Sequence, residues 1–185
     1  AAGRLRCYVC KRHIFTELLK LAGDATLCDG TNHSDLAVYR PGRKALEELG
    51  VRSPLAEADI SKPEIRMLGA QLGFRRPDQM ARPCLLTRFP YGVKPSSLNL
   101  KLAAGAEAAV EALMKEDEGL QGIRFRCRFP DGVSPVMHVE RSSVKDEKAL
   151  ERLSEGLKKR LEERGQALRV ELVDELSGYF DRVKG

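Results

Sequence analysis

The sequence predicts an α/β protein with two domains, a parallel-sheet α/β domain over residues 1–95 and a small α+β domain over residues 96–185. Segments with helical periodicity alternate with short apolar segments along the whole chain, which is the pattern of α/β folds. Residues 93–97 are rich in turn formers and separate two such series. The chain has 185 residues, 42% of them hydrophobic and 32% charged, enough for a folded core without disulfides.

The first domain is expected to pair two short strands in parallel, each preceded by a helix. Apolar residues follow a helical stripe over residues 12–21, and residues 25–28 form a short apolar segment typical of a strand. Pro41 opens a second helix that Gly50 ends. Residues 51–55 then read as a short extended segment, which is limited by the proline within it.

The clearest local signal is a capping box at the end of the first domain. Ser61 can accept a hydrogen bond from the free amides of a first helical turn, Glu64 stands three residues later, and Gly73 ends the helix. Only two or three strands are predicted, fewer than in an average sheet, and none precedes the first helix. We therefore expect a further segment of this domain to lie N-terminal to Ala1.

The second domain repeats the order of helix and strand. A helix is predicted over residues 98–115, followed by alternating strands over 123–127 and 136–139. A second helix is predicted over 146–163 and a third strand over 168–173. Together these elements predict a small α+β module.

The charge pattern limits the classes of partner. The net charge is +5, and the positive residues are interleaved with carboxylates, which favours an anionic small molecule or phosphate site at least as much as nucleic acid. No run approaches the roughly 18 apolar residues of a membrane span. The first residues also lack the apolar stretch of a secretory signal. The sequence therefore predicts a cytoplasmic protein without a membrane partner.

Three of the five cysteines are candidate metal ligands. Cys7 and Cys10 form a Cys-x-x-Cys pair among cationic residues just before the predicted first helix, and these neighbours favour thiolates. Two ligands do not complete a site, and Cys84 is the best third candidate. Cys7 and Cys10 are also compatible with a redox-active dithiol or with two cysteines that have no function. Cys28 and Cys127 lie in predicted strands and are expected to be buried thiols.

Five motifs in a fixed order carry a resemblance to a known family. They are RCYVCK (residues 6–11), DGTN (29–32), YRPG (39–42), VRSPLAEA (51–58) and RFPYG (88–92). Together they resemble the LarE proteins, ATP-dependent sulfur transferases that build the nickel-pincer nucleotide cofactor of lactate racemase. The resemblance spans residues 6 to about 140 well and the remainder loosely.

The resemblance implies a PP-loop ATP pyrophosphatase, an adenine nucleotide alpha hydrolase-like enzyme that uses ATP and Mg²⁺. Such an enzyme adenylates a carboxylate of a pyridinium-3,5-biscarboxylate mononucleotide and replaces the adenylate with sulfur. The family signature Ser-Gly-Gly-x-Asp-Ser is absent from this sequence. Residues 1–95 are therefore expected to be the C-terminal portion of the PP-loop domain, with the ATP site mostly in a missing N-terminal half or on a separate polypeptide. Loss of ATP chemistry stays open as a third possibility.

The resemblance also implies two possible sulfur sources. In one type a protein cysteine gives up its sulfur, and the position of Cys84 resembles that of the sacrificial cysteine. In the other type three cysteines hold a [4Fe-4S] cluster with an exchangeable sulfide, and the set Cys7, Cys10 and Cys84 fits this type better. Arg88 closely follows Cys84 and is expected to meet an anionic substrate as a catalytic residue.

Further site residues follow from the resemblance. Arg124 and Arg126 alternate on one predicted strand and are expected to clamp the substrate phosphate, or else to form a solvated strand face. Glu107 and Glu140 resemble acidic positions near a metal or the substrate, or else are ordinary surface carboxylates. The domain over residues 96–185 is thereby expected to serve substrate binding and oligomerisation of a homo-oligomer.

Four residues that follow the first predicted strand are expected to close the nucleotide crevice or to form a tight turn. They are Asp29, Gly30, Thr31 and Asn32.

Two other function classes fit parts of the sequence. A PP-loop enzyme of tRNA thiolation would need a contiguous basic face, and the dispersed charge argues against it. A non-enzymatic module is the second alternative, in which the three cysteines and one histidine bind zinc.

Overall fold

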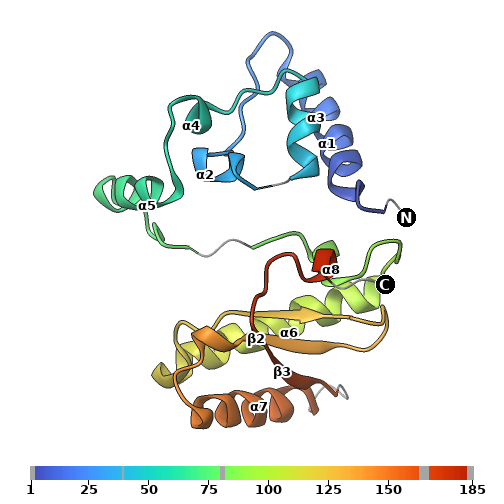
Figure 1. Cartoon of the computed structure of the whole chain (residues 1–185), viewed down its shortest axis with the longest axis vertical. Coiled ribbons are helices and arrows are strands. Elements are labelled where there is room, and N and C mark those ends of the chain that lie inside the picture. Colours follow the sequence, from blue (N-terminus) through green and yellow to red (C-terminus); the bar gives the residue numbers. More distant parts are fainter. Residues whose placement is uncertain (1–2, 39, 80–81, 163–166, 183–185) are drawn as a thin grey trace. The chain divides into compact units, whose positions relative to one another are not determined.

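The computed structural model describes residues 3–38, 40–79, 82–162 and 167–182 (Figure 1). The chain divides into two compact units between Arg82 and Pro83, whereas the sequence predicts a boundary after residue 95. The site residues within each unit have defined positions relative to one another.

The first unit is helical, and its helices carry the labels of Figure 1. They are α1 (Arg6–Ala22), α2 (His33–Leu36), α3 (Pro41–Glu48), α4 (Pro54–Glu57) and α5 (Lys62–Gln71). Helix α1 packs on α3, where the Tyr8 hydroxyl donates to Glu48 at 2.6 Å. Gly42 is buried beneath the Lys11 side chain. The contact is so close that a Cβ at this position would lie 2.8 Å from Lys11 Cδ. The predicted capping box of α5 is confirmed, with Ser61 and Glu64 bonded reciprocally.

The predicted parallel strands of the first unit are reduced to a single parallel bridge between Cys28 and Arg52. Asp29 N donates to Arg52 O at 2.8 Å, and Arg52 N donates to Leu27 O at 3.0 Å. The extended segment stops there because Pro54 opens α4 two residues later. Within the described residues of this unit, the predicted parallel pairing is thus present only as this one bridge.

The second unit is an α/β module whose predicted helices and strands are confirmed within two residues at each end. Its elements are η1 (Leu85–Arg88), α6 (Ser97–Glu116), η2 (Glu118–Leu120), β1 (Phe125–Arg128), β2 (Val136–Glu140), η3 (Arg141–Ser143), α7 (Glu147–Glu162), β3 (Arg169–Val173) and α8 (Tyr179–Arg182). Helix α6 begins at a serine cap, where Ser96 Oγ accepts from Asn99 N at 3.0 Å.

The sheet of the second unit is mixed and three-stranded, in the order β1-β2-β3. Strands β1 and β2 are antiparallel, whereas β2 and β3 are parallel and joined through α7. In register, Arg126 stands opposite His138, which stands opposite Glu171. Since side chains alternate along a strand, these three residues share one face of the sheet.

The other face of the sheet packs on α6 and α7. The core includes Phe125, Cys127, Phe129, Met137 and Val139 from the sheet, Ala103, Ala106 and Val110 from α6, and Ala149, Leu153, Leu157 and Leu161 from α7. The two helices approach closely at Gly156, where a Cβ would lie 2.7 Å from Leu113 Cδ2. The polar residues Arg126, His138 and Glu171 therefore lie on the face opposite the helices.

The segment between the two predicted domains belongs with the second unit because of one aromatic pair. Phe89 is fully buried and stacks on Phe129, with ring centroids 4.5 Å apart. Phe129 N also donates to Arg88 O at 2.9 Å. The predicted linker at 93–97 thus follows a segment that is already fixed to the sheet.

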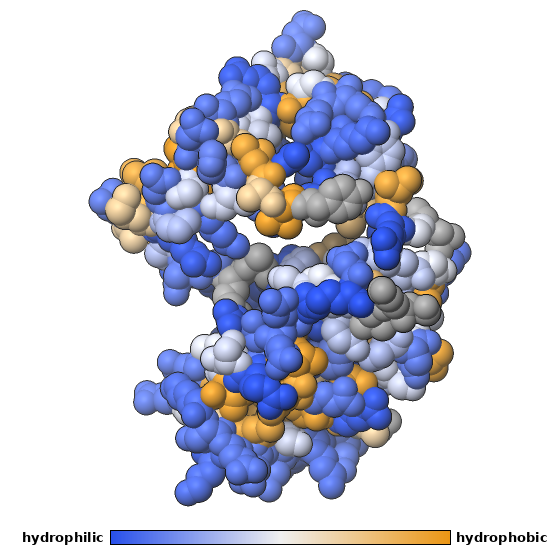
Figure 2. Space-filling view, viewed as in Figure 1, coloured by the Kyte–Doolittle hydropathy of each residue, from blue (hydrophilic) through white to orange (hydrophobic). Residues whose placement is uncertain are grey.

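Hydrophilic side chains cover most of the face shown in Figure 2. None of the helices in the described ranges is long and apolar enough to cross a membrane.

Replacement of Phe89 by alanine should destabilise the second unit by about 3 kcal/mol or more, because it empties a fully buried aromatic site. Urea denaturation followed by circular dichroism measures this loss. The matched control is Leu98→Ala, since Leu98 is 68% exposed at the start of α6 and should cost less than about 0.5 kcal/mol. Equal effects of the two substitutions would contradict the assignment of Phe89 to the core.

Candidate functional site

The cysteine pair lies on helix α1. The sequence places it before the helix, but α1 starts at Arg6, so Cys7 and Cys10 lie in its first two turns. Both thiols are exposed. Residues three apart on a helix face the same side. The pair can therefore offer two adjacent sulfur ligands to one metal.

The turn after the parallel bridge is organised around the Asp29 carboxylate. This carboxylate accepts from Thr31 N at 3.1 Å, from Thr31 Oγ1 at 2.6 Å and from Ser53 Oγ at 2.7 Å. Burial raises the pKa of Asp29, but the hydrogen bonds from Thr31 and Ser53 outweigh it, so the pKa is lowered. Lys11 of α1 lies 3.8 Å away and adds its charge. The ionised carboxylate of Asp29 thus holds the turn together.

The remainder of the predicted nucleotide motif caps helix α2. Asn32 is buried at 8% exposure and forms a capping box with Asp35. Its Nδ2 donates to Asp35 Oδ2 at 3.0 Å. Residues 29–32 therefore form a tight turn, which is compatible with a ligand-binding role but does not depend on one.

Cys84 is exposed and precedes the short helix η1 in the second unit. Its carbonyl accepts from Thr87 N at 2.9 Å and from Thr87 Oγ1 at 2.7 Å. The backbone at Cys84 is therefore fixed while its thiol remains accessible.

Arg88 is not a surface residue, because its side chain is 3% exposed and paired with Glu107. Arg88 Nε donates to Glu107 Oε1 at 2.7 Å, and Nη2 donates to Oε2 at 2.8 Å. Cys127 N donates to Glu107 Oε1 at 3.0 Å. This geometry gives both residues a role in holding η1, α6 and β1 together.

The other predicted acidic residue is also paired with an arginine. Glu140 Oε2 lies 2.6 Å from Arg124 Nε on the polar face of the sheet. Arg126 lies on the same face, and burial and the charge of Arg88 lower its pKa. The structure thus brings Arg124, Arg126 and Glu140 together on one sheet region.

Three further residues of this face, Arg128, His138 and Tyr179, were not predicted from the sequence as site residues. Arg128 is 4% exposed, and its pKa is lowered to about 10 by burial and by Arg88 and Arg126. Its guanidinium carbon lies 4.7 Å from the Tyr179 ring. Arg128 continues the alternation of Arg124 and Arg126, so the two-residue period of the strand could have identified it as a residue of this face. No sequence pattern pointed to Tyr179.

His138 is the neutral partner of Arg128. Arg128 Nη1 lies 3.1 Å from His138 Nδ1, and since arginine only donates, Nδ1 accepts. The proton of the neutral ring is then on Nε2, which lies 3.6 Å from Glu171 Oε2. Burial and the charge of Arg128 lower the pKa of His138 to about 4.

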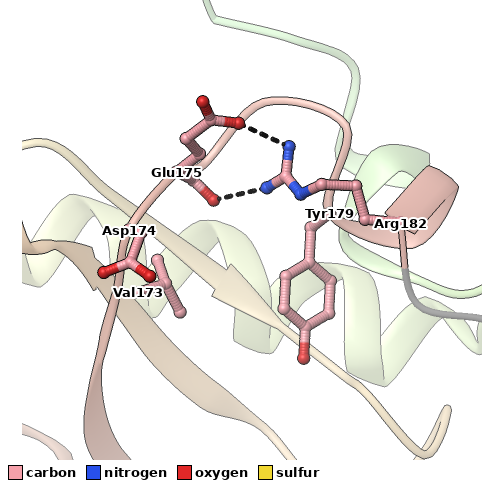
Figure 3. Close-up of a pocket in the computed structure, with 5 residues that line it drawn as sticks. All are labelled: Val173, Asp174, Glu175, Tyr179 and Arg182. Carbon is pink, nitrogen blue, oxygen red and sulfur yellow. Dashed lines mark hydrogen bonds and ion pairs between the residues drawn. The ribbon is translucent and has the colours of Figure 1, made fainter.

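The segment after β3 folds over this polar face. Arg128 Nη2 donates to Leu176 O, and Tyr179 packs on His138 with ring centroids 4.6 Å apart. Figure 3 shows Arg182 turned back onto Glu175, with Nη1 at 2.7 Å from the carboxylate. An open pocket of about 520 Å³ lies here, lined by Val173, Asp174, Glu175, Tyr179 and Arg182.

The cysteines differ in accessibility. Burial and Glu107 raise the pKa of Cys127 to about 12, so this thiol stays protonated, as expected for a buried strand residue. Cys28 is exposed, so the expectation that it is buried is wrong; the single bridge leaves it uncovered. Within the described ranges, no three His, Cys, Asp or Glu side chains gather as a metal site. Cys7 and Cys10 belong to the first unit and Cys84 to the second, and their joint role stays a prediction.

Comparison with known proteins connects the chain to a nucleotide synthase. No protein-family model matches it. It is 43% identical over 111 residues to an uncharacterised protein of Synechocystis sp., a match to 58% of the chain and 41% of the relative. It is 35% identical over 109 residues to the pyridinium-3,5-bisthiocarboxylic acid mononucleotide synthase of Lactiplantibacillus plantarum, 57% of the chain and 40% of that protein.

An uncharacterised protein of Methanocaldococcus jannaschii is 37% identical over 99 residues, 52% of the chain and 38% of the relative. The chain therefore spans only about two fifths of the length of the relatives that it matches.

The His138 environment predicts a specific dependence of stability on pH. The folded pKa of about 4 lies below the ordinary 6.5, so the unfolded chain binds the proton more readily between these values. Stability is then complete above pH 6.5 and falls as the pH decreases toward 4. Between about pH 7 and about pH 5.5, the wild type should lose about 1 kcal/mol more than His138→Gln.

Urea denaturation at the two pH values measures this difference, and glutamine retains an acceptor for Arg128. An NMR titration of His138 with a midpoint near 6.5 would contradict the assignment.

Proposed function

We propose that the chain takes part in ATP-dependent sulfur transfer to the carboxylates of a pyridinium-3,5-biscarboxylate mononucleotide, as a sulfur transferase or its C-terminal part. The observation that supports this most is the 35% identity over 109 residues to a synthase of the corresponding bisthiocarboxylic acid mononucleotide. The product named for that relative differs from a biscarboxylate by sulfur at the carboxyl groups. Sulfur transfer to an activated carboxylate accounts for that difference.

The chemistry requires activation before sulfur enters. A carboxylate is a poor electrophile, so ATP converts it to an acyl adenylate and pyrophosphate leaves. A sulfur nucleophile then attacks the acyl carbon, and AMP leaves with the electron pair of the broken C–O bond. A thiocarboxylate remains.

The proposed ligand set for a [4Fe-4S] cluster is Cys7, Cys10 and Cys84. The chemistry of the first two fits, because both thiols are exposed on one helix face near its N-terminus. Cys84 fits by its exposure and its fixed backbone. A bound cluster with one iron free of protein ligands would supply an exchangeable sulfide.

The polar face of the sheet is the proposed site for the mononucleotide phosphate. Arg124, Arg126 and Arg128 extend to one side of β1 and its N-terminal extension. Arginine guanidinium groups with this alternation are suited to bind the oxygens of a phosphate. The turn of residues 29–32 is proposed to serve the nucleotide of ATP–Mg²⁺ in the first unit.

Iron analysis tests the cluster. Protein purified without oxygen should contain about four irons and four acid-labile sulfides per chain, with a visible absorption band. Cys84→Ala should lose both, whereas Cys28→Ala should keep them, because Cys28 is equally exposed but outside the proposed set. Zinc in place of iron would contradict the cluster and favour a structural zinc site. A metal-free chain that loses hydrogen sulfide from Cys84 during turnover would favour the sacrificial route.

Substitution of Arg126 tests the phosphate site. Arg126→Gln should weaken the binding of nicotinate mononucleotide by about 10- to 100-fold, since it removes a charge-assisted hydrogen bond. Isothermal titration calorimetry measures the affinity. Arg141→Gln is the control, because Arg141 is exposed and pairs with Asp174. Equal affinity of both variants would exclude Arg126 from the site.

A further inference from the structure

Three hydrogen-bonded steps connect the backbone of Cys84 to a buried carboxylate on α6. The first step is the pair of bonds from Thr87 N and Thr87 Oγ1 to the Cys84 carbonyl, at 2.9 and 2.7 Å. A hydroxyl has a single proton, and here the bond to Cys84 uses it. Thr87 Oγ1 is therefore an acceptor toward any other partner.

The second step is Arg88, which supplies that donor. Its Nη1 lies 2.8 Å from Thr87 Oγ1 and 3.4 Å from Pro83 O. The guanidinium thus contacts the chain on both sides of Cys84. These contacts require that the guanidinium plane is held in one orientation.

The third step is Glu107, which sets that orientation. The Arg88 Nε and Nη2 donors bond the two oxygens of Glu107 at 2.7 and 2.8 Å, and a planar fork fixes both groups. Cys127 N holds the carboxylate in turn at 3.0 Å. Arg88 is almost fully buried, so water does not replace these bonds at low cost.

We propose that Glu107 is a positioning residue that holds Cys84 in place for sulfur transfer, through Arg88 and Thr87. The inference rests on the proposed function for Cys84 and adds the group that sets its geometry. It also gives Glu107 a role that needs no metal.

Hydrogen exchange tests the network without requiring turnover. In Glu107→Gln, exchange of the amides in residues 84–89 should rise at least about tenfold, a factor that corresponds to about 1.4 kcal/mol. Peptides from β2 and α7 should change much less. The control is Glu116→Gln, at a residue of α6 like Glu107, which breaks the exposed pair with Arg160 of α7 and should leave residues 84–89 unchanged. A uniform rise across the second unit, or no rise at residues 84–89, would overturn the inference.

Thr87 variants separate positioning from packing. Thr87→Val removes the hydroxyl at nearly constant shape and should raise exchange at residues 84–89 while the Arg88–Glu107 pair remains. Thr87→Ser keeps the hydroxyl and should behave as the wild type. If the serine and valine variants behave alike, the hydroxyl step does not exist and the inference fails.

Sulfur transfer distinguishes this inference from the proposed function. In Glu107→Gln, kcat should fall at least about tenfold with KM for the mononucleotide unchanged, and Thr87→Ser should retain wild-type kcat. If Glu107→Gln loosens residues 84–89 yet transfers sulfur at the wild-type rate, positioning by Glu107 is wrong and the proposed function stands. If Cys84→Ala transfers sulfur, the proposed role of Cys84 is wrong whatever the exchange shows.

Discussion

The buried pair of Arg88 and Glu107 is the interaction on which the second unit's site depends. Removing both groups from water carries a large desolvation penalty, which only good geometry and additional hydrogen bonds offset. Here the pair is bidentate, and Cys127 N completes the carboxylate's partners. Loss of one partner of such a pair typically costs 3–5 kcal/mol. The pair joins η1, α6 and β1, so the position of the Cys84 segment depends on the hydrophobic core beneath it.

The polar face of the sheet follows from a second constraint, the two-residue period of β1. Phe125 and Cys127 point into the core, so Arg126 and Arg128 must point to the other face. The segment 174–182 partly covers that face and desolvates the arginines, and their mutual repulsion lowers the pKa of Arg128. Burial and the positive charge of Arg128 lower the pKa of His138 to about 4 and keep it neutral. Carboxylates such as Glu140 and Glu171 lie beside these cations on the same face, so its positive and negative groups are interleaved.

The sequence predicted the second unit well because its local signals agree with its tertiary structure. Helix α7 buries residues at helical spacing, Leu153, Leu157 and Leu161, and the strands alternate clearly. In the first unit, residues 25–28 have a strand pattern, but a strand also needs partners on its edges, and local periodicity does not report them. For the same reason, the sequence did not show that Arg88 and Glu107 form a buried pair. They lie 19 residues apart on different elements, and only the fold brings them into contact.

The cysteines show how far residue type alone identifies a site. Cys127 is excluded by burial, which raises the pKa of its thiol to about 12. Exposure alone does not separate the remaining candidates, since Cys28 and Cys84 are both exposed. An ordered backbone does not separate them either, because the bridge to Arg52 holds the chain on both sides of Cys28. What differs is the network at Cys84, whose carbonyl is connected through Thr87 and Arg88 to the carboxylate of Glu107. A ligand or nucleophile on such an ordered segment loses less conformational entropy when it binds or reacts.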